Sequence, residues 1–447
     1  MVALLLAGVA GAQTPDLTQP LTLQGAADYA LSNHPELAAM QQEVRMAQAN
    51  LRIARAAGRL QASVNGYASS ATSSNMITAP PEVMPDDMRM IDPGRRLAGD
   101  IRVTAPLTTG GRVGAGITRG QRLVAASEAD VEAARLQVYY ETRRMYRMAL
   151  LQAKLVEVRQ REVEAMQELV RVDEVKLEVG KIPLYYFLRD KTRLAEAQQE
   201  LVNTQRDLQT AMYDLSVMLG LDRPQQLALA DTLGFVPVEY NEEQALKAAA
   251  SSRPELTAAR ARIEAAVAQI SAARAAYRPQ IAATVILDAM AGSGDMGSGG
   301  GYTAALVGSL PLVDAGTRGA EVAMAEAQRQ QLTQRERQLA QGVARDVLTA
   351  QAKLKAADQN IRTSLEAQAA AEEDYRATRL RYDVGKAINL EPLDALASLV
   401  KARVNAAQAL YEYNDAADAL QRATGCYAPA EKAGTTEGAG PKETEKL

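Results

Sequence analysis

The chain contains very few of the residues that build catalytic and metal sites. Its 447 residues include one cysteine, Cys426, and one histidine, His34, together with two phenylalanines and no tryptophan. A single cysteine excludes a disulfide within the chain and any CxxC site, and a single histidine excludes a histidine-based zinc or catalytic cluster. The sequence also lacks a Ser/His/Asp set and a phosphate-cradling glycine motif. We therefore expect a protein that is not an enzyme and carries no cofactor or metal.

Charge of one sign and long apolar runs are scarce as well. The formal net charge is −4 and the pI is near 5.5, so the sequence has no basic footprint for nucleic acid. Beyond the first residues, no run approaches the roughly 20 apolar residues of a membrane-spanning helix. If the chain crosses a membrane, we expect it to do so by other means.

The first residues, "MVALLLAGVAGAQT", are typical of an export signal. An apolar run from Val2 to Val9 is followed by Ala10-Gly11-Ala12, which fits the small-residue pattern of a cleavage site. We predict a signal peptide over residues 1–12, with a short buried segment as the alternative. A signal peptide indicates an exported protein.

What the chain does contain is an internal duplication. Four stretches of the first half recur in the same order in the second half: "ADYALSNHPELAA" as "LKAAASSRPELTA", "ARAAGRLQASV" as "ARAAYRPQIAATV", "APLTTGGR" as "LPLVDAGTR" and "LEVGKIP" as "YDVGKAI". The spacings within the halves agree, except for an insertion in the first half between about Val64 and Ile101. Rigid helices packed side by side require such equal lengths, whereas flexible linkers do not. We predict repeats over residues 13–225 and 226–425, followed by a disordered polar tail over 426–447.

Each repeat is predicted to begin with a helical segment, near residues 23–57 and 241–277, and to continue into a strand hairpin. Leu60, Ala62 and Val64 alternate with polar residues, as does a return stretch around Ile101 to Leu107. In the second repeat the first strand carries Ile281, Ala283, Val285 and Leu287, and the return strand carries Leu306, Leu310 and Leu312. Glycine- and proline-rich turns separate the strands of each pair. The insertion therefore lies in the loop of the first hairpin.

Five methionines fall in the predicted strand-connecting loops: Met76, Met84, Met88, Met90 and Met296. Thioethers bind copper(I), which makes such a group a candidate metal site. Because no cysteine or histidine accompanies them, scattered loop methionines are the favoured interpretation.

After each hairpin the sequence predicts a long helix, a Val-Gly-Lys turn and a second helix that runs back. The stretch from Arg112 to Glu178 holds no proline and would be about 100 Å long as one helix. In the returning helices, Leu194, Leu201, Leu208 and Leu215 are spaced by heptads, as are Leu399, Ala406, Tyr413 and Leu420. We predict two long antiparallel coiled-coil hairpins, with Gly180 and Gly385 at positive φ in their turns.

This order of elements resembles the TolC family of outer-membrane efflux proteins over roughly residues 20 to 425. The resemblance is carried by "ALSNHPEL", "ASSRPEL", "ARAAYRPQI", "PLVDAGTR" and "YDVGKAINLEPLDAL". It implies a mainly α fold with β structure. Three chains would each contribute four strands to one twelve-stranded β-barrel in the outer membrane, joined to an α-helical barrel that crosses the periplasm. Four strands cannot close a barrel alone, which agrees with a homotrimer.

The resemblance also implies site residues. The helical turns match those on which periplasmic adaptor proteins dock: Val179, Gly180, Lys181, Val384, Gly385 and Lys386. Glu391 and Asp394 match acidic residues that ring the periplasmic entrance of the tunnel, although acids in the first turn of a helix also stabilise it simply as caps. Tyr382 matches a gate-locking tyrosine. The position expected for its acidic partner holds Tyr186, and a gate arginine corresponds to Ala387, so the lock is expected to be incomplete or rebuilt.

By this resemblance the protein is expected to be a passive exit duct in the bacterial outer membrane. It would act in tripartite efflux or type I secretion with a periplasmic adaptor and an inner-membrane pump of the RND, ABC or MFS type. Outer-membrane lipid would surround its strands. The alternative is a periplasmic coiled-coil adaptor or scaffold that spans no membrane, since such proteins also carry helical hairpins. Two equal halves with amphipathic strand hairpins favour the duct.

Overall fold

The computed structural model describes residues 20–71, 75–76, 90–91, 94–235, 237–238, 241–292 and 298–427. The predicted signal peptide and all of the predicted tail except Cys426 and Tyr427 lie outside these residues, as do the side chains of the five loop methionines. The chain forms two compact units. We name them the helical unit (Met1–Gln41, Asp130–Leu256 and Leu339–Leu447) and the sheet unit (Gln42–Ala129 and Thr257–Gln338).

Helices make up most of the described chain. They are α1 (Leu23–Asn33), α2 (Pro35–Ala56), α3 (Arg112–Glu178), α4 (Leu184–Met218), α5 (Glu242–Ser252), α6 (Pro254–Arg274), the 3-10 turn η2 (Ala275–Tyr277), α7 (Thr317–Asp383) and α8 (Leu390–Thr424). The predicted long helices are confirmed, because α3 and α7 each run for 67 residues without a break. Among the described helices, none is both long enough and apolar enough to cross a membrane.

The helical segment predicted at the start of each repeat consists of two helices. The breaks fall at His34 and Arg253, whose backbones are extended with ψ of 125° and 117°. Each residue precedes a proline, and the proline ring disfavours the helical conformation of the residue before it. The Pro35 and Pro254 rings then sit at the first position of the next helix, where no backbone N–H is needed.

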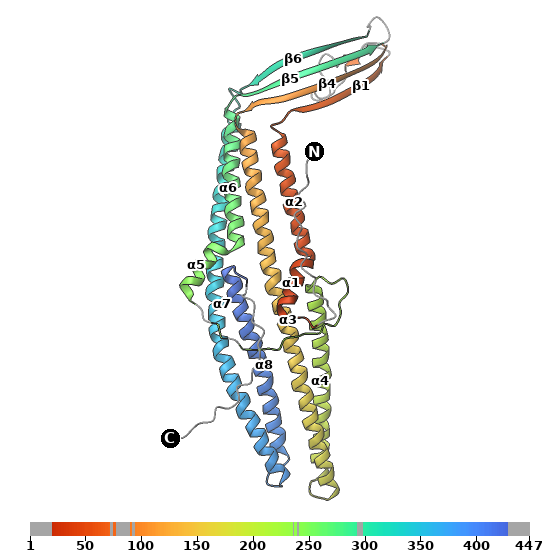
Figure 1. Ribbon diagram of the computed structural model, residues 1–447, viewed down its shortest axis with the longest axis vertical. Helices are drawn as coiled ribbons and strands as arrows, with labels where there is room; N and C mark the ends of the chain where they lie inside the picture. Colours follow the sequence, from red (N-terminus) through yellow and green to blue (C-terminus); the bar gives the residue numbers. More distant parts are fainter. Residues whose placement is uncertain are drawn as a thin grey trace, which may run out of the picture. The chain divides into compact units, whose positions relative to one another are not determined.

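In the helical unit, α3 lies beside α4 and α7 lies beside α8 (Figure 1). The predicted seam of α8 is buried at Leu399, Ala406, Tyr413 and Leu420. In α4 the predicted Leu215 is buried together with Ala197, Thr204 and Ala211, whereas Leu194, Leu201 and Leu208 are half-buried. Near the turns the two hairpins share one apolar core, in which Val163 and Leu169 of α3 pack with Leu396 and Val400 of α8. The small alanines of the seams allow the helix backbones to approach closely.

The sheet unit holds a four-stranded antiparallel sheet in the order β1-β4-β5-β6 (Figure 1). Its strands are β1 (Gln61–Ala71), β4 (Gly94–Thr109), β5 (Gln280–Gly292) and β6 (Gly299–Ser309). The predicted hairpins are confirmed as β1 with β4 and β5 with β6, and the β4–β5 pair joins the two repeats. The first hairpin's loop carries a short ribbon of β2 (Asn75–Met76) and β3 (Met90–Ile91).

The prediction for the last strand was too long. Leu306 lies in β6, but β6 ends at Ser309, so Leu310 and Leu312 lie outside it. Pro311 explains the end of the strand, because proline has no N–H to donate to a ladder. At the start of the first hairpin, Leu60 likewise precedes β1.

Candidate functional site

The turns of the two helical hairpins have the same backbone geometry. Gly180 and Gly385 adopt φ of 71° and 74°, which confirms the predicted left-handed conformation. In the first turn, the Lys181 N–H donates to the Lys176 carbonyl at 2.8 Å, and in the second the Lys386 N–H donates to the Arg381 carbonyl at 2.8 Å. These bonds are the mark of a Schellman motif, which satisfies the carbonyls left over at a helix end.

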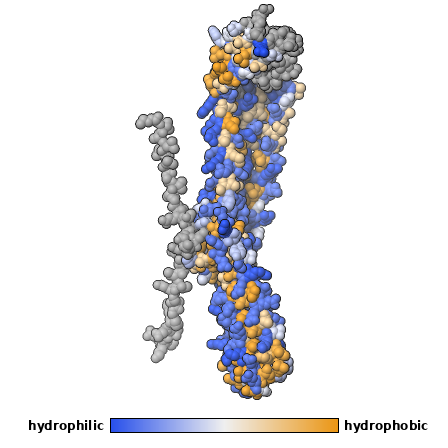
Figure 2. All heavy atoms as spheres, turned by 90° about the vertical axis from the view of Figure 1, so that its right-hand side faces the viewer, coloured by the Kyte–Doolittle hydropathy of each residue, from blue (hydrophilic) through white to orange (hydrophobic). Residues whose placement is uncertain are grey.

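Apolar side chains surround these turns and are exposed. Val179 is 62% exposed and Val384 is 61% exposed. The others at the two turns are Leu184, Tyr185, Leu188, Ile388 and Leu390. Figure 2 shows apolar residues gathered at the end of the helical unit where the α3–α4 turn lies. An exposed apolar patch of this kind marks a surface for protein contact.

Of the two acids predicted for a gate, Glu391 lies in the first turn of α8 and Asp394 follows one turn later. Glu391 Oε1 accepts a hydrogen bond from the Ile388 N–H at 3.2 Å, and its Oε2 lies 3.4 Å from Nη1 of Arg381. Asp394 is exposed. Glu391 therefore has a capping role in this chain, while the Asp394 carboxylate is free to face solvent.

Tyr382 has an acidic partner on α3, at another position than the one that Tyr186 occupies. Its hydroxyl donates to Asp173 Oδ1 on α3, and both side chains are buried, at 3% and 0% exposed. The partner is therefore not at the position of Tyr186. The Lys176 ammonium lies 3.2 Å from the centre of the Tyr382 ring, a cation–π contact from the same α3 helix.

A second buried carboxyl group and an amide complete this set. Asn389 Nδ2 donates to Asp173 Oδ2 and also to Asp190 Oδ2 of α4, the latter at 2.9 Å. Asn389 is the N-cap residue of α8, but its side chain makes no cap bond, because it is turned to the carboxyl groups. We name Asp173, Asp190, Tyr382 and Asn389 the carboxyl cluster. It ties the α3–α4 hairpin to the start of α8 and the end of α7.

Burial and mutual repulsion shift the protonation of this cluster. Burial, and then the neighbouring Asp173 side chain, raise the pKa of Asp190 to about 7. Burial and the bond to Asp173 also raise the pKa of the Tyr382 hydroxyl, so this group stays a donor. Burial lowers the pKa of Lys176. A carboxyl group with a pKa near 7 changes its charge in the physiological range.

A second group of buried charged side chains joins the two repeats at an earlier part of α3, farther from the turns. The Arg143 guanidinium binds the Asp418 carboxylate of α8 with two bonds, at 3.0 and 3.1 Å. Arg147 also donates to Asp418, and its Nη1 donates to the Asn414 carbonyl at 2.9 Å. All three charged side chains are buried. We name Arg143, Arg147 and Asp418 the arginine cluster.

Sequence reasoning missed Asp173, Asp190 and Asn389, although a signal was present for the two acids. Asp190 lies four residues before Leu194, at the position that continues the heptad seam of α4. Asp173 follows Leu169 by four residues and Met166 by seven, in the apolar stripe of α3. A charged residue in an apolar stripe requires a buried partner, and this requirement could have pointed to the pair. Nothing in the sequence marks Asn389 beyond its place before α8.

The four-stranded sheet presents its apolar side chains outward. The residues Val64, Leu97, Tyr302 and Leu306 are 77%, 63%, 78% and 68% exposed. On the opposite face Asp100 is buried, and it accepts hydrogen bonds from Asn65 Nδ2 at 3.0 Å and from the Tyr67 hydroxyl at 3.3 Å. This is the reverse of the pattern in a water-soluble sheet, which covers its apolar face.

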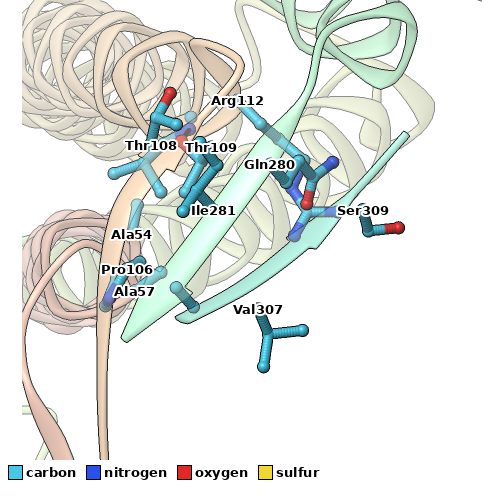
Figure 3. Close-up of a pocket in the computed structure, with 13 residues that line it drawn as sticks. Ala54, Ala57, Pro106, Thr108, Thr109, Arg112, Gln280, Ile281, Val307 and Ser309 are labelled. Atoms are coloured by element: carbon cyan, nitrogen blue, oxygen red, sulfur yellow. Dashed lines mark hydrogen bonds between the residues drawn. The ribbon is translucent and has the colours of Figure 1, made fainter. Parts of the chain in front are cut away.

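The sheet unit also contains a cavity of about 390 Å³ between the base of the sheet and the helices α2 and α3 (Figure 3). Its walls are mostly apolar or hydroxyl-bearing, and Arg112 contributes the one guanidinium among the lining residues. General acid–base catalysis needs a positioned group that titrates near neutral pH. None of the residues that line this cavity offers such a group.

Comparison with known proteins agrees with this architecture. A family model described as "Outer membrane efflux protein" matches residues 26–221 and 245–426. A search of curated protein sequences found no significant match.

Solved structures with the same fold cover nearly the whole chain. The MtrE outer membrane channel of Neisseria gonorrhoeae in its open state has 21% identity and a TM-score of 0.74, over 90% of this chain and 89% of that chain. The CmeC outer membrane channel of Campylobacter jejuni has 17% identity and a TM-score of 0.74, over 90% and 85%. The outer membrane protein VceC of Vibrio cholerae has 20% identity and a TM-score of 0.72, over 90% and 96%. At these identities the likeness shows the fold.

Proposed function

Since the chain belongs to the outer membrane efflux protein family, we propose that it is the outer-membrane exit duct of a tripartite efflux or type I secretion system. The duct is passive and performs no covalent chemistry. Its repeats span residues 13–225 and 226–425, after a signal peptide over residues 1–12. A periplasmic adaptor protein recruits it to an inner-membrane pump of the RND, ABC or MFS type.

The exposed apolar face of the sheet carries this proposal. Val64, Leu97 and Leu306 would meet lipid, while the face with Asn65 and Asp100 would line a water-filled lumen. The strands hold 11 to 16 residues, enough for the roughly 9–11 residues of a tilted transmembrane strand. Burying apolar area contributes about 25 cal/mol per Å², so lipid is the natural environment of this face.

The open edges of the sheet support an assembly of several chains. Within the described residues, β1 pairs only with β4 along its length and β6 pairs only with β5. In lipid every backbone N–H and C=O group needs a partner, and bacterial barrels have at least about eight strands. Three copies joined through β1 and β6 would form a twelve-stranded barrel, and their helical hairpins would form a tunnel through the periplasm.

The turns of the hairpins are the proposed docking site for the adaptor. They carry Val179, Gly180 and Lys181 in one hairpin and Val384, Gly385 and Lys386 in the other. Two observations support this assignment, the exposed valines and the matching turn geometry of the two repeats. An adaptor bound at these turns would contact the ends of α3, α4, α7 and α8 at once.

We assign the gate to the same end of the helical unit. Asp394, with Glu391 beside it on α8, would narrow the tunnel and attract cations when three copies surround the axis. Tyr382 would hold the hairpins in the closed arrangement through Asp173.

Single-channel recording in planar bilayers tests the duct and its gate together. The purified protein should be extracted from outer membranes as a trimer and should conduct. The Glu391→Ala/Asp394→Ala variant should conduct more or lose block by divalent cations. The control is Glu174→Ala, which removes one exposed acid from α3 and should leave conductance unchanged.

The possible negative results separate the two parts of the proposal. A monomer that urea extracts from membranes and that never conducts would contradict the duct and favour the periplasmic scaffold. A conducting trimer in which the double variant keeps the original current and block would reject only the gate residues.

A further inference from the structure

One oxygen of the carboxyl cluster lacks a hydrogen bond. Asp190 is fully buried, its Oδ2 accepts from Asn389, and within the described residues its Oδ1 has no partner. The Asp173 carboxyl group lies within side-chain hydrogen-bond reach of Asp190. Both oxygens of Asp173 are already acceptors, one from Tyr382 and one from Asn389. A buried acceptor without a donor is costly, and two carboxylates in contact repel each other.

From this geometry we propose that Asp190 and Asp173 form a proton-binding site. The shared proton stabilises their buried contacts with Tyr382 and Asn389, and these contacts latch the α3–α4 hairpin to the α7–α8 hairpin. The bound proton sits on Asp190 and is donated to Asp173. The protonated Oδ1 of Asp190 then donates to Asp173 and is no longer without a partner, and the buried pair carries one negative charge in place of two. No bond other than the O–H of this carboxyl group forms or breaks, and the proton is exchanged with solvent.

The charged groups around the pair favour a proton over a metal ion. On α4, Arg189 donates to Asn389 Oδ1 at 2.9 Å. On α3, Lys176 lies over the Tyr382 ring, with Asp383, Arg379 and Lys181 as its other charged neighbours. Within the described residues, neither carboxylate forms a salt bridge. The same residues contain no group of three or more His, Cys, Asp or Glu side chains that could hold a metal ion.

Burial, and then the hydrogen bond with Asp173 and the charge of Asp173, raise the pKa of Asp190 to about 7, which gives the direction of the effect. In the separated hairpins Asp190 would have a pKa near the ordinary value of about 3.9. The closed arrangement therefore holds one more proton than the open one between about pH 4 and pH 7. The latch is complete at the acidic end of this window, weakens as pH rises through it, and is fully lost above about pH 7.

The consequence for the channel rests on the proposed function, but the latch itself can be measured without conduction. Lys181 and Lys386 are exposed in the two turns and can be replaced by cysteine for spin labels, in a Cys426→Ser background. Electron–electron distance measurements on the detergent-solubilised full chain then report the separation of the hairpins from pH 5 to pH 8.5.

Wild-type protein should show its narrowest distance distribution at pH 5 and a second population that grows as pH rises towards 7 and stays constant above it. The ratio of open to closed should change by up to about tenfold per pH unit inside the window. The Asp190→Asn variant places a permanent N–H donor beside Asp173 and should stay closed at every pH. Infrared difference spectra should show a protonated carboxyl band that wild type loses between pH 6 and pH 8 and that Asp190→Asn lacks.

The outcomes are distinct. Equal pH dependence in wild type and Asp190→Asn, or no such infrared band, would overturn the shared proton. A response to Ca²⁺ at constant pH, without a response to pH, would assign the pair to a cation instead and also overturn it. A pH-dependent distance in a protein that never conducts would leave the latch standing and contradict the duct.

Discussion

The arginine cluster and the carboxyl cluster both join the two repeats through buried polar groups, but their charges are opposite in kind. In the arginine cluster, two guanidinium groups surround one carboxylate, Asp418. In the carboxyl cluster, two carboxyl groups share one amide, Asn389, without a salt-bridge partner among the described residues. Attraction between opposite charges stabilises the arginine cluster. In the carboxyl cluster the two carboxylates repel each other until one of them binds a proton.

This difference indicates different roles for two parts of the same hairpins. Arginine stays charged at every pH that a folded protein meets, so the arginine cluster is constant. The pKa of Asp190, raised to about 7 by burial and by Asp173, makes the carboxyl cluster sensitive to conditions. A duct that opens at one end needs one contact between its hairpins that persists and one that can be released. The arginine cluster fits the first role, and the carboxyl cluster fits the second.

The largest effect on stability is expected from disrupting the arginine cluster. Asp418→Ala leaves Arg143 and Arg147 buried without their carboxylate, and loss of one partner of a buried ion pair costs about 3–5 kcal/mol. We expect a strongly lowered midpoint of thermal unfolding, measured by circular dichroism in detergent. The matched control is Asp207→Ala, an exposed acid on α4, which should change stability by no more than about 0.5 kcal/mol. If both variants lowered the unfolding midpoint by similar amounts, the arginine cluster would not contribute specifically to the stability of the fold.

A smaller and more local effect is expected from Tyr382→Phe. The ring and its contact with Lys176 remain, but Asp173 loses one donor, and a hydrogen bond to a charged group contributes about 1.5–3 kcal/mol. Hydrogen exchange of amides near the Val-Gly-Lys turns should become about 10- to 100-fold faster, while amides around Arg143 keep their rate. Tyr302→Phe, which removes a hydroxyl from an exposed ring on β6, is the control and should change neither. If Tyr382→Phe accelerated amide exchange equally around both clusters, the carboxyl cluster and the arginine cluster would not be independent contacts.

The smallest effect should come from the turns themselves. Gly385→Ala forces a side chain into a positive φ of 74° where no neighbouring atom lies within 4 Å, so backbone strain of about 1–2 kcal/mol is the only cost. Gly342→Ala, inside α7 and equally free of neighbours, should instead stabilise by about 0.5–1 kcal/mol. Thermal unfolding of the pair tests this contrast. If the two variants shift stability in the same direction, the left-handed turn is not what requires glycine at residue 385.

Much of the fold could be predicted because it repeats. The absence of proline between Arg112 and Glu178, together with the glycine that follows each long helix, predicted both hairpins and the bounds of the first long helix. Alternation around Val64 and Ile101 predicted the strands. One error lay at a proline, because Pro311 ends the last strand earlier than predicted.

The candidate site could be predicted only in part. The geometry of the two turns could be predicted because each turn is a local motif, whereas the gate role of Glu391 stays a prediction. The acid that binds Tyr382 was not identified, since Asp173 is more than two hundred positions away and only packing of α3 against α7 brings the two together.

The sequence by itself determined the elements of this protein and their duplication, because helix length, strand alternation and turn glycine are properties of neighbouring residues. Only the tertiary structure decided which polar groups meet inside it. Asp173 and Asp190 lie on different helices of one hairpin, Tyr382 and Asn389 on the other, and their shared chemistry exists only once the hairpins pack. Burial removes the water that would otherwise solvate each carboxylate, and this loss of solvation creates the need for a proton.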